Sequence, residues 1–212
     1  MLRIALPSGK SLEERTVEFF TRAGITMFRE GACNRVTFPI QYGLSEGVFV
    51  KPVRIPGLVQ EGKFDLGITG QDLVIEAKAA VWTCAFLPYS RSTDGPTRAV
   101  LVAAENDTVG CIEDVPPNST VFSEYPVETD VVFSTLGIPI SIVPSPGTTE
   151  AEIPWNYRFG VCLSETGQSL RDNKLKVVAT LFESSTVLIV NEDLPREKIE
   201  AIELLRKFFR GI

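Results

Sequence analysis

The chain has 212 residues, 44% of them hydrophobic and 23% charged, and its formal net charge is −6. This composition is typical of a protein with a substantial core, and the lack of a basic stripe argues against nucleic acid as a main partner. The chain contains no histidine and four scattered cysteines, so a zinc site is improbable and catalysis by Ser-His-Asp or Cys-His groups is excluded.

The first ninety residues alternate between strands and helices. Residues 2–6 form an apolar strand, and a helix follows that we expect to begin at a capping box of Ser11 and Glu14 and to end at Gly24. Further strands are expected at 48–50, 64–68 and 81–87, with helices at 55–61 and 71–77. The short connections between these elements favour a largely parallel sheet.

A polar stretch from 88 to 96, which contains two prolines, separates this series from a second one and is predicted to be a hinge. Strands are then expected at 97–103, 120–122, 140–143, 159–163, 177–181 and 186–190, with helices at 127–136 and 169–173. A final amphipathic helix at 195–209 places its apolar residues on one face; these are Ile199, Ile202, Leu205, Phe208 and Phe209. The pattern predicts two α/β lobes with a ligand bound between them, at the carboxyl ends of strands.

The chain has no apolar run of about 20 residues, so no transmembrane helix is predicted. Its first residues indicate a strand rather than a signal peptide, and its cysteines are expected to be reduced. Together these features predict a cytoplasmic protein.

Three loops have the composition of ligand-binding segments. Pro7–Ser11 follows the first strand, and either a ligand-facing loop or an ordinary strand-to-helix turn with its own cap explains it. It is not a P-loop, because Ile4 and Ala5 occupy the positions where an earlier glycine is required. Asp65–Asp72 carries small residues into a helix N-terminus, and close strand–helix packing explains it equally well. Glu165–Ser169 combines hydroxyl groups with a glycine, as a phosphate-binding turn does, although an ordinary capped turn has the same pattern.

In their order and spacing, these loops and several other segments together resemble the catalytic chain of the ATP phosphoribosyltransferase family. The segments are Leu2–Pro7 with Gly9, Asn34–Arg35, Val50–Pro52 with Ile55–Pro56, Asp65–Gly70 with Asp72, Gly147–Glu150, Glu165–Gly167 with Ser169–Leu170, and Thr186–Asn191. The resemblance implies transfer of a phosphoribosyl group from phosphoribosyl pyrophosphate (PRPP) to N1 of ATP, with release of pyrophosphate, as the first step of histidine biosynthesis.

The resemblance also implies a two-lobed α/β fold like that of type II periplasmic binding proteins, with mixed, mostly parallel sheets. Residues 1–90 and 180–212 would form the first lobe, and residues 91–179 the second, which carries the phosphate-binding turn. Magnesium would bind through the substrate phosphates, with no metal ligands from the protein. The implied assembly is a homodimer, or a hetero-oligomer with a regulatory chain that resembles histidyl-tRNA synthetase.

The resemblance assigns three groups of site residues. Lys10 and Arg35 would be catalytic. The PRPP 5-phosphate would bind at Glu165, Thr166, Gly167, Gln168 and Ser169. The cleft for nucleotide and pyrophosphate would be lined by Gly9, Lys51, Asp65, Gly67, Thr69, Gly70, Asp72, Gly147, Thr148, Thr149 and Glu150. A Gly167→Val substitution is expected to abolish phosphate binding with little loss of folding, provided that the turn has an ordinary φ angle.

The chain departs from the family pattern at four positions. Arg158 and Cys162 stand where the family has two aspartates before the phosphate turn, Arg54 replaces a typical aspartate, and Ser8 replaces a basic residue. These changes keep a second hypothesis open: a non-catalytic or substrate-altered relative that binds a nucleotide or a sugar phosphate.

Overall fold

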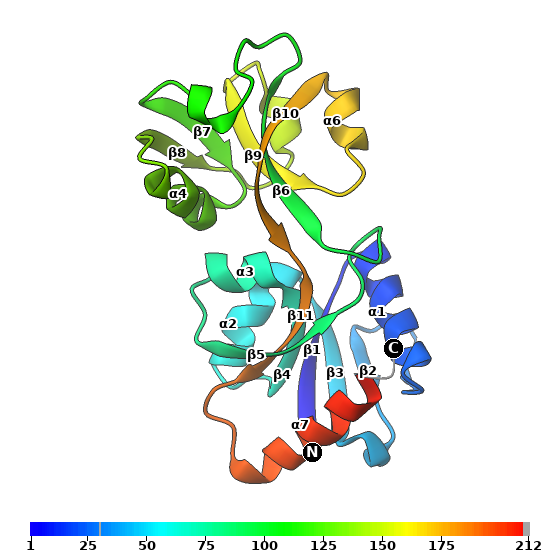
Figure 1. Cartoon of the computed structure of the whole chain (residues 1–212). Coiled ribbons are helices and arrows are strands. Elements are labelled where there is room, and N and C mark those ends of the chain that lie inside the picture. The colour runs from blue at the N-terminus through cyan, green and yellow to red at the C-terminus, as the bar shows by residue number, and fades with distance from the viewer. Residues whose placement is uncertain (30, 210–212) are drawn as a thin grey trace. The chain divides into compact units, whose positions relative to one another are not determined.

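The computed structural model of the protein describes residues 1–29 and 31–209, which form two units, each built around its own sheet (Figure 1). The first unit comprises Met1–Gly95 and Ser185–Ile212, and the second is the continuous segment Pro96–Ser184. The chain therefore passes from one unit to the other twice. No helix within the described residues is long and apolar enough to span a bilayer.

The first unit contains a six-stranded sheet with the order β2-β3-β1-β4-β11-β5. The strands are β1 (Leu2–Pro7), β2 (Arg35–Thr37), β3 (Leu44–Val50), β4 (Leu66–Gly70), β5 (Val81–Leu87) and β11 (Thr186–Asn191). The helices are α1 (Lys10–Arg22), α2 (Ile55–Gln60), α3 (Gln71–Glu76) and α7 (Arg196–Phe209), and the 3-10 turns are η1 (Ile40–Tyr42) and η2 (Pro52–Arg54).

Both faces of this sheet are covered, and β1 shows how. Ile4 and Leu6 pack on one face against Phe20 of α1 and Leu205 of α7, whereas Ala5 faces the other side and packs near Ile55 of α2. Successive side chains of a strand point to opposite faces, so a central strand with helices on both sides must be apolar throughout. Leu2–Leu6 satisfies this requirement, apart from the exposed Arg3.

The second unit contains a five-stranded sheet with the order β10-β6-β9-β7-β8. Its elements are β6 (Thr97–Ala104), η3 (Ile112–Asp114), β7 (Ser119–Ser123), α4 (Pro126–Thr135), β8 (Ile140–Pro144), α5 (Thr149–Glu152), β9 (Phe159–Ser164), α6 (Gln168–Asp172) and β10 (Leu175–Ser184). Phe133 of α4 packs with Phe159 and Val161 on one face. Leu170 of α6 packs with Val100 and Cys162 on the other.

The sheets are mixed, but the expected majority of parallel pairings is wrong. Among the described strands, five of the nine pairings are antiparallel. The chain enters the second unit along β6 and leaves it along β10, and these two neighbours run in opposite directions. After the return, β11 is also antiparallel to both of its neighbours, β4 and β5.

Two details of the helices also differ from expectation. Helix α1 begins at Lys10 after Gly9 at the N-cap, which has a φ of 114° and makes no side-chain capping bond, so the capping box at Ser11 and Glu14 is wrong. Gly24, with a φ of 72°, follows the end of this helix as predicted. In α7, Ile199 is 48% exposed and does not share the buried face of Ile202 and Leu205.

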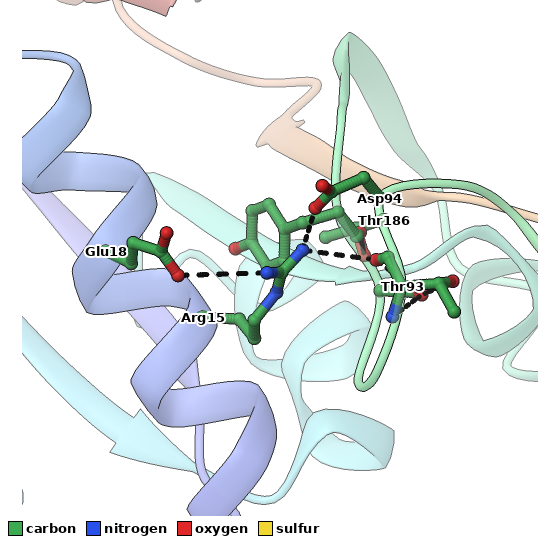
Figure 2. A network of polar contacts seen from close by, with 7 residues as sticks. Arg15, Glu18, Thr93, Asp94 and Thr186 are labelled. Atoms are coloured by element: carbon green, nitrogen blue, oxygen red, sulfur yellow. Dashed lines mark hydrogen bonds and ion pairs between the residues drawn. The ribbon is translucent and has the colours of Figure 1, made fainter.

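The predicted hinge stretch at 88–96 is fastened to the first unit by a polar network (Figure 2). Arg15 of α1 donates to the Thr93 carbonyl at 3.2 Å and to the Asp94 carboxylate, and it lies 3.7 Å from the carboxylate of Glu18. Thr186 Oγ1 donates to the carbonyl of Tyr89 at 2.5 Å. These bonds hold residues 88–94 in the first unit, and the chain passes to the second unit between Gly95 and Pro96.

Candidate functional site

The carboxyl ends of three parallel strands come together at one edge of the second sheet. The strands β8, β7 and β9 are neighbours and run in the same direction. Beyond their ends, Ser145 N donates to Ser123 O at 2.7 Å, and Glu124 N donates to Val161 O at 3.0 Å. Ligands of α/β proteins commonly bind at such an edge.

The turn that follows β9 contains the five residues predicted to bind phosphate. Gly167 has a φ of 70°, which is a left-handed conformation that favours glycine. Gln168 N donates to Thr166 Oγ1 at 3.4 Å, and Ser169 Oγ donates to Glu150 Oε1 at 2.9 Å. The turn is thus braced on both sides of Gly167. A Gly167→Val variant would be strained, so the condition for a small effect on folding, an ordinary φ angle at the turn, is not met.

A pocket of about 390 Å³ opens beside this turn, within the second unit. One wall is formed by Ser164, Glu165, Thr166 and Gly167. The sheet contributes Arg98, Val100, Leu175, Val177 and Thr180, and α6 contributes Leu170 and Arg171. The pocket therefore combines an apolar floor with two arginines, which is the general character of sites for small charged molecules.

Sequence reasoning did not identify Arg98 and Arg171. Arg171 follows Gly167 by four residues, and helical spacing could have suggested that its side chain returns over the turn. Arg98 lies on β6 opposite Ser164 of β9, and this register could not be read from the sequence.

The segment Gly147–Glu150 lies at the same edge of the second sheet. Gly147 and Thr148 have φ values of 121° and 56°. Thr149 is fully buried, and its Oγ1 lies 2.9 Å from Glu124 Oε1 and 2.8 Å from Ser145 Oγ. Thr149 thus fastens the segment, while Glu150 reaches the phosphate turn through Ser169.

In the first unit, most of the predicted residues gather at one edge of the sheet. Gly9 and Lys10 follow β1, Lys51 follows β3, and the donation from Ser8 N to Val50 O at 2.8 Å joins these two loops. Arg35 begins β2 opposite Val48, near the same end of β3. The side chains of Lys10, Arg35 and Lys51 are exposed, and none of them makes an ion pair within the described residues.

Thr69, Gly70 and Asp72 also belong to this edge. Thr69 Oγ1 donates to the carbonyl of Pro52 at 3.1 Å and so holds the segment that follows Lys51. A Cβ atom at Gly70 would lie 2.1 Å from Asp72 Oδ1, so the Asp72 carboxylate occupies the space above this glycine. Both Thr69 and Asp72 are buried, and we infer that they position the edge rather than contact a ligand directly.

Asp65 and Gly67 make contacts that stabilise the first unit. Asp65 precedes β4, at the opposite end from Gly70; it accepts from Arg3 N at 2.8 Å and pairs with Lys198 at 2.7 Å. Gly67 allows close packing, because a Cβ atom there would lie 2.4 Å from Ile55 Cγ2. For these reasons we leave both residues out of the proposed site.

The two positions that depart from the family aspartates also have structural contacts. Arg158 forms two bonds to the carboxylate of Asp107, at 2.8 and 3.0 Å, and the pKa of Asp107 falls to about 2, chiefly because of this bonding. Cys162 is 1% exposed. Burial, followed by the charges of Glu150 and Glu124, raises the pKa of its thiol, so this group stays neutral.

Residues 51–211 match the family model described as ATP phosphoribosyltransferase. The chain belongs to the ATP phosphoribosyltransferase family. The ATP phosphoribosyltransferase of Chlorobium luteolum is 35% identical over 97% of this chain and 70% of its own length. That of Methanothermobacter thermautotrophicus is 34% identical over 100% of this chain and 72% of its own length.

Solved structures confirm the fold. An ATP phosphoribosyl transferase (HisG:HisZ) complex from Thermotoga maritima contains a chain that matches with a TM-score of 0.77 and 24% identity over the full length of both chains. An arginine-bound binding protein from the same organism matches with a TM-score of 0.60 and 17% identity, over 99% of this chain and 94% of its own. The predicted type II binding-protein-like fold of the ATP phosphoribosyltransferase family is therefore present in this chain.

Proposed function

We propose that this chain transfers the phosphoribosyl group of PRPP to N1 of ATP, with release of pyrophosphate, and binds the PRPP 5-phosphate at the turn Thr166–Ser169. One observation carries the proposal: in a member of the ATP phosphoribosyltransferase family, this turn lies at the carboxyl end of β9 and forms one wall of a pocket. The bond from C1′ to pyrophosphate breaks, and a bond from C1′ to N1 forms.

The contribution of the protein to this reaction is mainly positioning and charge. Displacement at an anomeric carbon passes through a cationic, oxocarbenium-like state, and negative charge develops on the leaving pyrophosphate. We propose that Lys10, Arg35 and Lys51, on one edge of the first sheet, bind the phosphates of ATP and of the leaving group. No histidine base is required, because N1 of adenine carries no proton.

Magnesium is proposed to act through the substrates. Within residues 1–29 and 31–209, no group of three or more carboxylate or thiol side chains is arranged to hold a metal ion. In enzymes of phosphorylated substrates, Mg²⁺ is commonly bound mainly by phosphate oxygens. The ion would neutralise charge on pyrophosphate.

Assembly is also a proposal. We propose a homodimer, or a hetero-oligomer with a regulatory chain, and the Thermotoga maritima structure, which is a HisG:HisZ complex, supports a hetero-oligomer. Sedimentation of the purified chain, alone and with the regulatory chain from the same organism, would test this. A monomer under both conditions would contradict it.

The decisive experiment is product analysis with ATP, PRPP and Mg²⁺. We expect phosphoribosyl-ATP and pyrophosphate in equal amounts, and no product from ATP that is methylated at N1, because the acceptor nitrogen is then blocked. The absence of product with the purified chain, with or without a regulatory chain, would contradict the proposal.

A second candidate function is binding of a nucleotide or sugar phosphate without turnover. It is favoured by Arg158 and Cys162, because one is paired with Asp107 and the other is a buried neutral thiol, so neither offers a carboxylate to the ribose hydroxyls. Calorimetry separates the two candidates: this one predicts heat on addition of PRPP without release of pyrophosphate.

A further inference from the structure

Two arginines, Arg98 and Arg171, line the pocket beside the phosphate turn, together with one acidic residue, Glu165. Three further carboxylates lie close by, because Glu183 is opposite Arg98 in the sheet, and Glu150 and Asp172 accept bonds from the turn residues Ser169 and Gln168. The whole chain has a net charge of −6, which repels anions at long range. An anion can therefore bind here only through local groups, and the two guanidinium groups are the strongest of these.

Arg171 is held over the turn by its neighbours. A Cβ atom at Gly167 would lie 3.1 Å from Arg171 Nη1, so the guanidinium lies directly against the glycine. Arg171 Nη2 donates to Gln168 Oε1 at 2.9 Å, and Gln168 Nε2 donates to Asp172 Oδ1 at 2.7 Å. The Gln168 side chain therefore orients Arg171, and its own contact with a ligand would be through the main chain.

Arg98 approaches the same pocket from the sheet. It lies on β6 directly opposite Ser164, the last residue of β9 before the turn, and on the same face as Val100 two residues further. Within the described part of the chain, neither Arg98 nor Arg171 makes an ion pair with a carboxylate. Both guanidinium groups therefore remain available for an anionic ligand.

The pocket is larger than a phosphate ion requires. Its volume of about 390 Å³ lies in the range of sites for small organic molecules, and its floor contains Val100, Leu170 and Val177. An apolar floor suits the C–H face of a sugar ring, whereas arginines suit phosphate, to which they can donate two parallel bonds.

We infer that Arg98 and Arg171 bind the phosphate of a sugar 5-phosphate in this pocket, while its apolar floor covers the ribose. This inference rests on the proposed function, because it assigns the pocket to the phosphoribosyl part of PRPP. It adds two binding residues to the turn, and it changes the role of Gln168 from ligand to positioning residue.

The test uses the full chain and ribose 5-phosphate as the probe, with affinity measured by calorimetry. Arg98→Gln and Arg171→Gln should each weaken binding about tenfold to a hundredfold, as expected when a charged hydrogen bond is lost. In the product assay, the KM for PRPP should rise by a similar factor while the KM for ATP is unchanged. Arg98→Lys should recover part of the affinity, because it keeps the charge without the planar fork.

Lys174→Gln is the matched control, since it removes one positive charge from an exposed side chain of the same unit that does not line the pocket. It should leave the affinity unchanged. Val177→Phe fills the pocket from the half-exposed side of β10 without changing charge, and it should also abolish binding. If an arginine variant fails to fold, Val177→Phe still tests whether ribose 5-phosphate binds in this pocket.

Wild-type affinity for ribose 5-phosphate in folded Arg98→Gln and Arg171→Gln proteins would overturn the inference, even if the enzyme makes phosphoribosyl-ATP. Equal losses in those variants and in Lys174→Gln would also overturn it, because they would indicate a general charge effect. Failure of the proposed function is a different result: the wild type would bind ribose 5-phosphate through the two arginines but form no product.

Discussion

Gly167 is the residue on which the phosphate turn depends, and its φ of 70° makes a clear prediction. Gly167→Ala should destabilise the protein by about 1–2 kcal/mol, the usual cost of a left-handed conformation. It should also weaken binding of ribose 5-phosphate, because the added Cβ would lie 3.1 Å from Arg171 Nη1 and displace the guanidinium.

Gly137→Ala is the control for this change. Gly137 also has a φ of 70° and lies in the same unit, but a Cβ atom there would meet nothing within 4 Å. Thermal unfolding should show a similar loss of stability in both variants, and calorimetry should show a loss of affinity only at Gly167. Equal affinities in the two variants would contradict the site.

A substitution of Arg158 would show whether this departure from the family pattern stabilises the fold or contacts the substrate. The bonds from Arg158 hold the pKa of Asp107 at about 2, below its ordinary value of about 3.9. They therefore stabilise the fold fully at a pH above the ordinary pKa. This stabilisation is lost as the pH falls from about 4 to about 2.

Arg158→Gln should therefore lower stability at neutral pH by about 1 kcal/mol or less, because the Arg158 side chain is 47% exposed, and should leave stability below pH ~2 unchanged. Urea unfolding across this pH range would show whether the two curves converge in acid. The KM for PRPP should not change. A large change in this KM would instead place Arg158 against the substrate.

At the residue scale, the sequence predicted a turn at Glu165–Ser169, and the structure has a turn there. The predicted residues Lys10, Arg35 and Lys51 lie together at one edge of the first sheet. It misplaced Asp65, because the partners of this carboxylate come from distant parts of the chain, at Arg3 and Lys198. It also missed Arg98, because the antiparallel register that sets this side chain beside Ser164 is a tertiary property.

At the scale of elements, the packing of α2 on β4 depends on Gly67. A Cβ atom there would lie 2.4 Å from Ile55 Cγ2 and 2.8 Å from Val59 Cγ2, so Gly67→Ala should destabilise the fold by about 1–3 kcal/mol through overpacking. Gly57→Ala, in α2 itself, has open space around it and should stabilise the fold by up to about 1 kcal/mol.

Denaturant unfolding of the two variants should thus give effects of opposite sign. Equal stability of wild type and Gly67→Ala would show that α2 does not lie this close to β4. The same variants show whether close packing or ligand contact explains the glycine at position 67. If packing explains it, Gly67→Ala should lower the stability of the fold and leave the KM for ATP unchanged.

Strands and helices could be predicted from periodicity, and most of the expected ranges fall within the elements observed. The direction of the strands could not be predicted from periodicity. The expectation of parallel pairing came from the alternation of strands and helices, and it ignored the return of the chain along β10 and β11. The short strand β2 and the four-residue helix α5 carry too few residues to show a period.

At the scale of the whole molecule, the second unit is a single continuous segment inserted into the first. Its end strands β6 and β10 are paired, with Thr97 opposite Ser184, so its two termini lie together. It also has its own apolar clusters and contains the whole pocket. Such a segment has the properties of an independent domain.

A fragment of residues 96–184 should therefore fold alone, with a cooperative thermal transition, and bind ribose 5-phosphate but not ATP. Circular dichroism and calorimetry would measure both properties. A folded fragment that binds no ribose 5-phosphate would show that the pocket is not sufficient for binding.

We propose that this member of the ATP phosphoribosyltransferase family is a working transferase whose phosphoribosyl group is held by the second unit. The most direct measurement is the rate of phosphoribosyl-ATP formation by the wild type and by Arg98→Gln at varied PRPP concentrations. We predict product from the wild type and an increased KM for PRPP in the variant. No product from the wild type, with or without a regulatory chain, would contradict the claim.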